Sequence, residues 1–176
     1  MNKKYYYFAT RIDRAMSDLL ESKDYLSSWL EKDTILVGVK DYHKKAIENA
    51  LLLSAFISYD RVFTKSNTEQ DNYHEYVSNE FGKLRQLTID KFSEEKLNMH
   101  NLVHKERSSS FAHSDGRSAG VSLVADNIFF VSTMRNPYGG YTFKDIQILK
   151  EMTEQLHDDF KNKQREIFNR YPESFK

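Results

Sequence analysis

The chain has 176 residues, and its 26 lysine and arginine residues balance 26 aspartate and glutamate residues. A formal net charge of +0 gives no overall field that would recruit a nucleic acid, so a polyanion would have to bind at a local basic patch. The absence of cysteine excludes a disulfide scaffold and thiolate metal sites, and 14% aromatic residues argue against disorder.

The length fits one domain with a sizeable core, or one domain with an appended element, and we expect a single domain over residues 1–176. The first residues lack the long apolar core of a signal peptide. The longest apolar run, from Ala50 to Ile57, is too short to span a bilayer. We therefore expect a cytoplasmic protein without a membrane partner.

The first element is predicted to be an amphipathic helix between Tyr5 and Leu30, because Ile12, Met16 and Leu19 keep helical spacing. The next run, residues 35–39, is rich in β-branched residues and interrupted by glycine. Its periodicity fits a short strand or the entry to the next helix equally well.

A second helix is predicted from Asp41 to about Thr64, and apolar residues cover more than one of its sides. Such a pattern is typical of a central helix that neighbours pack on most sides. The helix nevertheless ends in Tyr59, Asp60 and Arg61. These polar groups indicate a helix that emerges into water, unless a site lies nearby.

The second half of the chain is expected to alternate helices with one hairpin. Residues 65–70 read as a loop and residues 73–87 as a helix. Ser93 has the character of an N-cap for a helix that runs to about Phe111 and ends before Asp115. The predicted elements that follow are a β-hairpin at about 120–132, around Asp126-Asn127, and a helix at about 142–170 that opens on a Thr142 capping box. The predicted fold class is mainly α, a helical bundle of four or five helices with a small β-hairpin before the last helix.

The helix that starts near Ser93 carries an unusual polar face. His100, His104 and Arg107 recur on one side of it, at offsets of three and four. This face is either a solvated or partly buried polar surface or a site. The two imidazoles one turn apart have a spacing that suits zinc, yet Asn101 stands where a zinc protease needs glutamate. A metal-dependent hydrolase is therefore the third hypothesis, and we expect no metal and no cofactor.

The stretch after this helix carries the most informative motif. The spacing between Arg107 and His113 is expected by chance about once in such a chain, so it means little alone. The full sequence of the motif, Arg107-x-x-x-x-Ala112-His113-Ser114-Asp115, resembles the Arg-Asn-x-x-x-Ala-His-Ser-Asp signature of a subset of the HEPN superfamily. That superfamily comprises helical domains rich in metal-independent RNases.

A second segment strengthens the resemblance. Ser54-x-x-x-x-Tyr59-Asp-Arg61-Val-Phe63-Thr64 resembles the end of the preceding core helix in the same subset. The likeness covers about residues 41–115, which would form the core of a HEPN-like domain. Ser108 departs from the pattern, because the family commonly has asparagine, aspartate or histidine beside the arginine.

The residue types suit RNA cleavage without a metal. Histidine serves as base or acid near neutral pH, and the planar guanidinium of arginine matches phosphate oxygens. On a straight helix, six steps of about 100° would place His113 some 120° away from Arg107. The two would meet only where the helix ends or bends, or where two subunits face each other.

The resemblance implies a metal-independent endoribonuclease, a toxin or phage-defence effector that cleaves RNA by 2′-OH attack. Arg107 would stabilise the transition state and His113 would act as general base or acid. Asp115 would orient His113, Ser108 would support the arginine, and His104 and Tyr59 would line the groove. RNA is the expected substrate rather than DNA, in a homodimer with the motif at its interface and with an antitoxin protein as a possible partner. The alternative is a catalytically inactive HEPN-like binding or dimerisation module.

Overall fold

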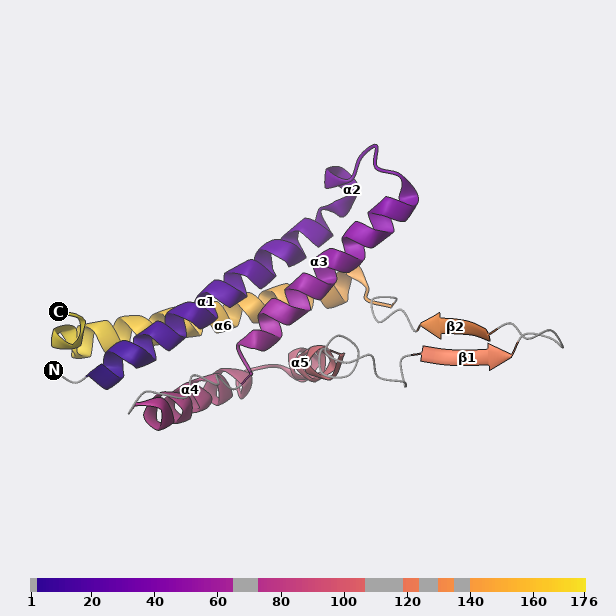
Figure 1. The fold of residues 1–176 in the computed structure, drawn as a ribbon. Coiled ribbons are helices and arrows are strands. Elements are labelled where there is room, and N and C mark those ends of the chain that lie inside the picture. Colours follow the sequence, from indigo (N-terminus) through magenta and orange to yellow (C-terminus); the bar gives the residue numbers. More distant parts are fainter. Residues whose placement is uncertain (1–2, 65–72, 107–118, 124–129, 135–139) are drawn as a thin grey trace.

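The computed structural model describes residues 3–64, 73–106, 119–123, 130–134 and 140–176 (Figure 1). This part of the chain is mainly helical, which confirms the predicted class. Its α-helices are α1 (Lys3–Leu30), α2 (Lys32–Ile35), α3 (Asp41–Arg61), α4 (His74–Ile89), α5 (Glu94–Glu106) and α6 (Phe143–Arg170). A short 3-10 helix, Pro172–Phe175, follows α6.

Two strands lie between α5 and α6, in the segment where the sequence predicts a hairpin. Strand β1 (Ala119–Leu123) pairs antiparallel with β2 (Phe130–Met134). The register places Ala119 opposite Met134 and Leu123 opposite Phe130. Figure 1 shows this pair away from the helices.

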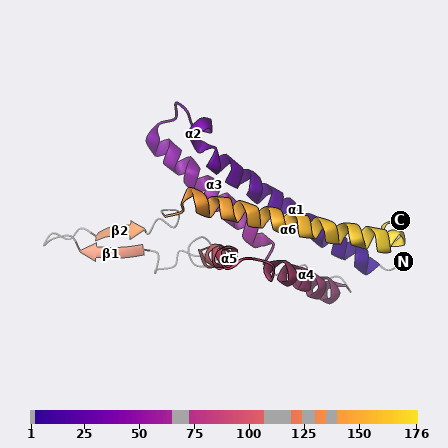
Figure 2. The same ribbon diagram turned by 180° about the vertical axis from the view of Figure 1, so that it is seen from behind.

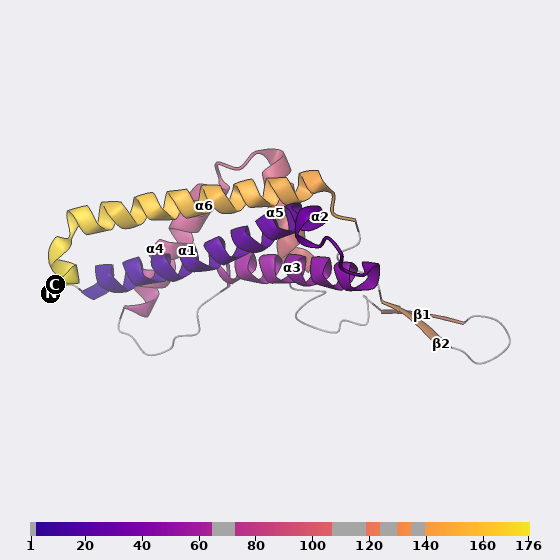
Figure 3. The ribbon, with the colours of Figure 1, turned by 90° about the horizontal axis from the view of Figure 1, so that it is seen from above.

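The core forms mainly between the first and last long helices. Helices α1 and α6 lie side by side along most of their length, and the two chain ends meet at the same end of the molecule (Figures 1 and 3). Helix α3 packs against α1, and α4 and α5 lie on one side of these helices (Figure 2). The fully buried apolar side chains of α1 and α6 recur every three or four residues, as an amphipathic helix requires, and include Ile12, Leu19, Leu26, Leu149, Met152, Leu156 and Phe160.

Helix α3 does not have the central position that its composition predicts. Burial is confined to its second half, from Leu52 to Asp60, while Tyr42 and Ile47 in its first half are exposed. The apolar residues of the first half therefore extend beyond the covering helices. The prediction was wrong because periodicity reports how many sides of a helix are apolar, not how far its neighbours reach along it.

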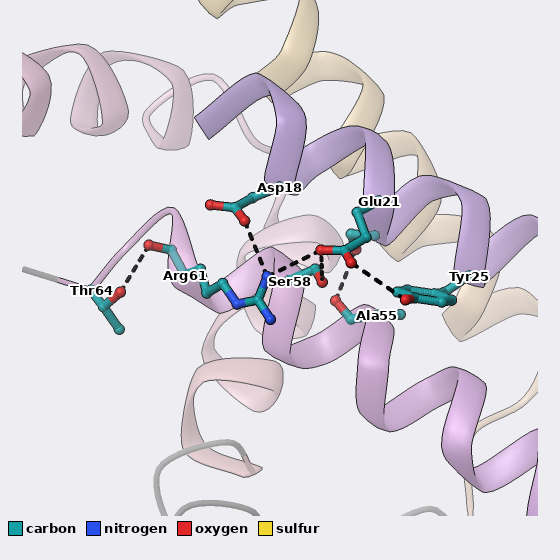
Figure 4. Close-up of polar contacts among 8 residues, drawn as sticks. Asp18, Glu21, Tyr25, Ala55, Ser58, Arg61 and Thr64 are labelled. Atoms are coloured by element: carbon teal, nitrogen blue, oxygen red, sulfur yellow. Dashed lines mark hydrogen bonds and ion pairs between the residues drawn. The ribbon is translucent and has the colours of Figure 1, made fainter. Parts of the chain in front are cut away.

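Polar groups tie α3 to α1 where the two helices cross. The buried Ser22 hydroxyl donates to the backbone carbonyl of Ala55 at 2.9 Å. One turn further on, the Ser58 hydroxyl donates to Glu21 at 2.8 Å, and the Arg61 guanidinium donates to Glu21 at 3.1 Å (Figure 4). These contacts fix the position of the last turn of α3 against α1.

The predicted helix starts are confirmed at two caps. The Thr142 hydroxyl accepts from the Asp145 backbone N–H at 3.2 Å, while the Asp145 carboxylate accepts from the Thr142 N–H at 2.7 Å, which completes a capping box. At α5, the Ser93 hydroxyl accepts from the Lys96 N–H at 3.4 Å. Both caps satisfy backbone donors that the first turn leaves unpaired.

The segment 35–39 forms no strand. It completes the single turn of α2 and then reverses the chain through Gly38, whose φ of 78° is readily available only to glycine. Leu36 is buried, whereas Ile35 and Val37 are exposed. Among the helices of the described residues, none combines the length and the apolar composition that crossing a membrane needs.

Truncation of one core side chain tests this architecture. Phe160 is 0% exposed and meets Phe81 edge-on at a ring-centroid distance of 5.5 Å. We expect Phe160→Ala to lower the free energy of unfolding by about 3–5 kcal/mol, the usual loss for a buried aromatic ring. Urea unfolding followed by circular dichroism measures this change.

The matched control is Phe143→Ala on the same helix, because Phe143 is 60% exposed. Its unfolding free energy should stay within about 0.5 kcal/mol of the wild-type value. Equal losses in the two variants would contradict the packing of α6 described above.

Candidate functional site

The last turn of α3 meets α5 through two buried polar side chains. Tyr59 and Asp60 are each 1% exposed, and their partners are His100 and His104 on α5. The prediction that α3 emerges into water here is wrong for both residues, because α5 covers them. It holds only for Arg61, whose side chain is 49% exposed.

The Tyr59 hydroxyl lies 2.9 Å from Nδ1 of His100. Burial, and after it the charge of Asp60, raises the pKa of Tyr59 well above its usual range, so the phenol keeps its proton. Among the described residues His100 is the one hydrogen-bond partner of this buried hydroxyl, so the hydroxyl proton is satisfied by donation to Nδ1, and the proton of the neutral imidazole then lies on Nε2. Tyr59 thus fixes the tautomer of His100 and does not itself line an open groove.

His100 has an environment that favours its neutral form. Its ring contacts Phe63 at a centroid distance of 4.6 Å and Phe92 at 6.3 Å. Burial lowers the pKa of His100, and the neighbouring His104 lowers it further, against an opposing effect of Asp60. We therefore assign His100 a structural role in joining α5 to α3.

His104 is held by a different kind of partner. Its Nδ1 lies 2.6 Å from Oδ1 of Asp60, a short contact typical of a charge-assisted hydrogen bond. The carboxyl group accepts, so Nδ1 carries a proton and donates it. The His104 side chain is 57% exposed although its partner is 1% exposed. The arrangement is a buried carboxyl group that orients a half-exposed imidazole.

The backbone that carries Asp60 is held from two sides. Arg61 contacts Asp18 at 3.3 Å and Glu21 at 3.1 Å on α1 (Figure 4). Arg85 of α4 donates to the backbone carbonyl of Val62 at 3.0 Å, and burial lowers the pKa of this guanidinium. Cations at a helix C-terminus also match the negative end of the helix dipole. The carboxyl group of Asp60 therefore projects from a fixed turn.

The remaining residues of the predicted site come after the end of α5 in the sequence. Arg107, Ser108, His113 and Asp115 lie outside the described residues, as do Asp126 and Asn127 of the predicted hairpin turn. Helix α5 is described up to Glu106. In the sequence, Arg107 follows His104 by three residues. The predicted extension of this helix to Phe111 also lies outside the described part.

Asp60 is the residue that sequence reasoning did not include in the site. The available signal was a carboxyl group that directly follows the buried positions Ala55, Phe56 and Tyr59 in an apolar helix. A charge in such a place needs a partner. The sequence alone did not indicate that the partner would be His104.

A zinc site at the two histidines is poorly supported by this geometry. In the described residues, no group of three histidine or acidic side chains converges so as to hold a metal ion. The Tyr59 hydroxyl donates to His100 and leaves a proton on Nε2 of that ring, where a metal would need a lone pair. His100 is therefore a hydrogen-bonded core residue.

Comparisons with known proteins add no family assignment. No family model, no curated protein and no solved structure matches this chain.

The lowered pKa of His100 predicts a pH dependence of stability. The unfolded chain has the ordinary histidine pKa of about 6.5 and therefore binds a proton that the folded state resists. The stabilising contribution is complete above about pH 7 and is lost as the pH falls through 6.5 toward the lower pKa of the folded state. Wild-type protein should therefore lose stability between pH 7.5 and pH 5.5, as measured by urea unfolding.

His100→Gln keeps a hydrogen-bond acceptor for Tyr59 but does not titrate. It should reduce this pH-dependent loss, whereas His74→Gln, at an exposed position on α4, should leave it unchanged. The same slope in wild type and His100→Gln would contradict the assignment of a neutral, buried His100.

Proposed function

We propose that the protein is a metal-independent endoribonuclease in which Arg107 and His113 cleave RNA by attack of the 2′-OH. The observation that carries the proposal is the Asp60–His104 pair, in which a buried carboxyl group orients a half-exposed imidazole three residues before Arg107. A carboxyl group that orients an imidazole is a recurrent device of acid–base catalysis. The resemblance of the following stretch to the HEPN motif points to the same chemistry.

The proposed roles follow from the residue types. Arg107 carries a permanent positive charge that suits the negative charge developing on the phosphorane oxygens. His113 transfers a proton as base or acid, Asp115 orients it, and Ser108 supports Arg107. His104 stands three residues before Arg107 in the sequence, and Tyr59 acts only indirectly, through its contact with His100.

A second candidate is a HEPN-like binding or dimerisation module without activity. Ser108 favours it, since serine replaces the asparagine, aspartate or histidine that the family commonly has beside the arginine. The metal-dependent hydrolase is disfavoured by the proton on Nε2 of His100, which follows from the Tyr59 contact.

The decisive experiment is cleavage of single-stranded RNA in excess EDTA. Products should end in 2′,3′-cyclic phosphate, because the attacking group is the adjacent 2′-OH, and DNA of the same sequence should survive. Denaturing gels and mass spectrometry of the product ends measure both outcomes. Intact RNA would favour the binding module, and cleavage that EDTA abolishes would favour the metal-dependent hydrolase.

Substitution of the two motif residues assigns this activity. His113→Ala should lower the cleavage rate by about 10²–10⁴-fold, the range for one acid–base group. Arg107→Ala should cost a comparable factor, as for loss of an oxyanion-type donor. The double variant should be little worse than either single one. His74→Ala and Arg14→Ala, at exposed positions on α4 and α1, are the matched controls and should keep wild-type rates.

We further propose that the enzyme works in the cytoplasm as a homodimer, as a toxin or defence effector whose partner is an antitoxin protein. Exposed Leu97 lies seven residues before His104 and so on about the same side of α5, where a second subunit would cover it. Light scattering at micromolar concentration should report twice the chain mass, and Leu97→Glu should shift this toward the monomer. A monomer in the wild type would remove the two-subunit version of the site.

A further inference from the structure

The two histidines of α5 lie one helical turn apart but have opposite hydrogen-bonding partners. His100 faces a hydroxyl donor, and His104 faces a carboxyl acceptor. We infer that His104 is a catalytic residue, the general base that accepts the proton of the 2′-OH, and that Asp60 is its positioning residue. This inference rests on the proposed ribonuclease function, which it deepens by assigning the acid role to His113.

The hydrogen bonds decide which nitrogen of each ring can act. Donation from Nδ1 of His104 to Asp60 leaves the lone pair of the neutral ring on Nε2. The His104 side chain is 57% exposed, as access of a substrate to this nitrogen requires. In His100, the same nitrogen carries a proton, because Tyr59 donates to Nδ1. Of the two rings, only His104 offers an accessible base.

Burial distinguishes this pair from a surface ion pair. Two exposed partners would be screened by water and contribute little, but Asp60 is 1% exposed. Its carboxyl group keeps much of its attraction for an imidazolium in this position. It therefore stabilises the charge that appears on His104 when the ring takes up a proton.

Rigid support fits the same role. The last turn of α3 is held by Arg61 on one side and by Arg85 on the other. A base must stay within hydrogen-bonding distance of the proton that it removes, and small displacements are expensive in rate. A carboxyl group on a loosely held helix end would not provide this precision.

The proposed step is balanced in atoms and charge. The 2′-OH proton moves to Nε2 of neutral His104 while the 2′-oxygen forms a bond to phosphorus. The bond between phosphorus and the 5′-oxygen breaks, and that oxygen receives a proton from the imidazolium of His113. The positive charge of Arg107 would offset the charge that develops on the non-bridging oxygens. One proton has then moved to His104 and one has left His113, and exchange with water restores both.

A substrate with a sulfur leaving atom separates the two histidines. In an RNA with a 5′-bridging phosphorothiolate, the leaving thiolate needs no proton, so the acid becomes dispensable while the base does not. The His113→Ala variant should cleave ordinary RNA about 10²–10⁴-fold more slowly than wild type. It should cleave the sulfur substrate at a rate within about tenfold of wild type. His104→Ala should be slow on both substrates by about 10²–10⁴-fold. Because His104→Ala removes a partner of the buried Asp60 carboxyl group and so costs stability, circular dichroism at the assay temperature establishes that the variant is folded before its rates are compared.

Asp60→Asn tests positioning rather than charge alone. The variant should be slow on both substrates, as His104→Ala is, because an amide donor allows the wrong tautomer. Nitrogen-15 NMR of the His104 ring reads this directly and does not depend on activity. In wild type, near neutral pH, the proton of the neutral ring should be on Nδ1, and in Asp60→Asn part of it should move to Nε2.

The outcomes are distinguishable. A wild-type protein that cleaves neither substrate would overturn the proposed function and this inference with it. A wild type that depends on His113 but is unaffected by His104→Ala would overturn the inference alone. So would a His104→Ala variant that the sulfur substrate restores, since His104 would then be the acid. An unchanged His104 tautomer in Asp60→Asn would remove Asp60 as the positioning residue.

Discussion

The carboxyl group of Asp60 is buried at the end of α3, and much of the local structure follows from that fact. A buried charge that loses its partner typically costs about 3–5 kcal/mol, so α5 has to lie where His104 reaches this carboxyl group. Three consecutive residues then contact two different helices. Tyr59 contacts His100, Asp60 contacts His104, and Arg61 turns back to the acidic residues of α1 (Figure 4). One helical turn thus connects the bundle core with the surface of the candidate site.

Much of the secondary structure follows from local sequence signals. The capping box at Thr142 and the N-cap at Ser93 depend on contacts within four residues, so the sequence contains all the information that places these helix starts. The position of α3 within the bundle has a different origin. Its first half is exposed although α3 packs against α1, and no periodicity within residues 41–61 reports how far that packing extends.

The candidate site shows the same division between local and tertiary information. The face that His100 and His104 share is a consequence of helical spacing and was predicted. The different hydrogen-bonding partners of the two histidines were not predicted. They come from Tyr59 and Asp60, on a helix about 40 residues away in sequence. The polar end of α3 was predicted to be solvated because its sequence does not show that α5 packs over Asp60 and buries it. Arg107 and His113 lie outside the described residues.

The pairing of α1 with α6 has a consequence for synthesis of the chain. Each of these helices covers the apolar side of the other, although they stand at opposite ends of the sequence (Figure 3). In a growing chain, α3 can pack against α1 early, but the part of the apolar surface of α1 that α6 covers stays exposed until α6 has emerged. The last turn of α3, which carries Asp60, also packs against α1. The bundle is therefore completed only after α6 has been synthesised, and chains that lack α6 leave the apolar side of α1 that α6 covers exposed to water.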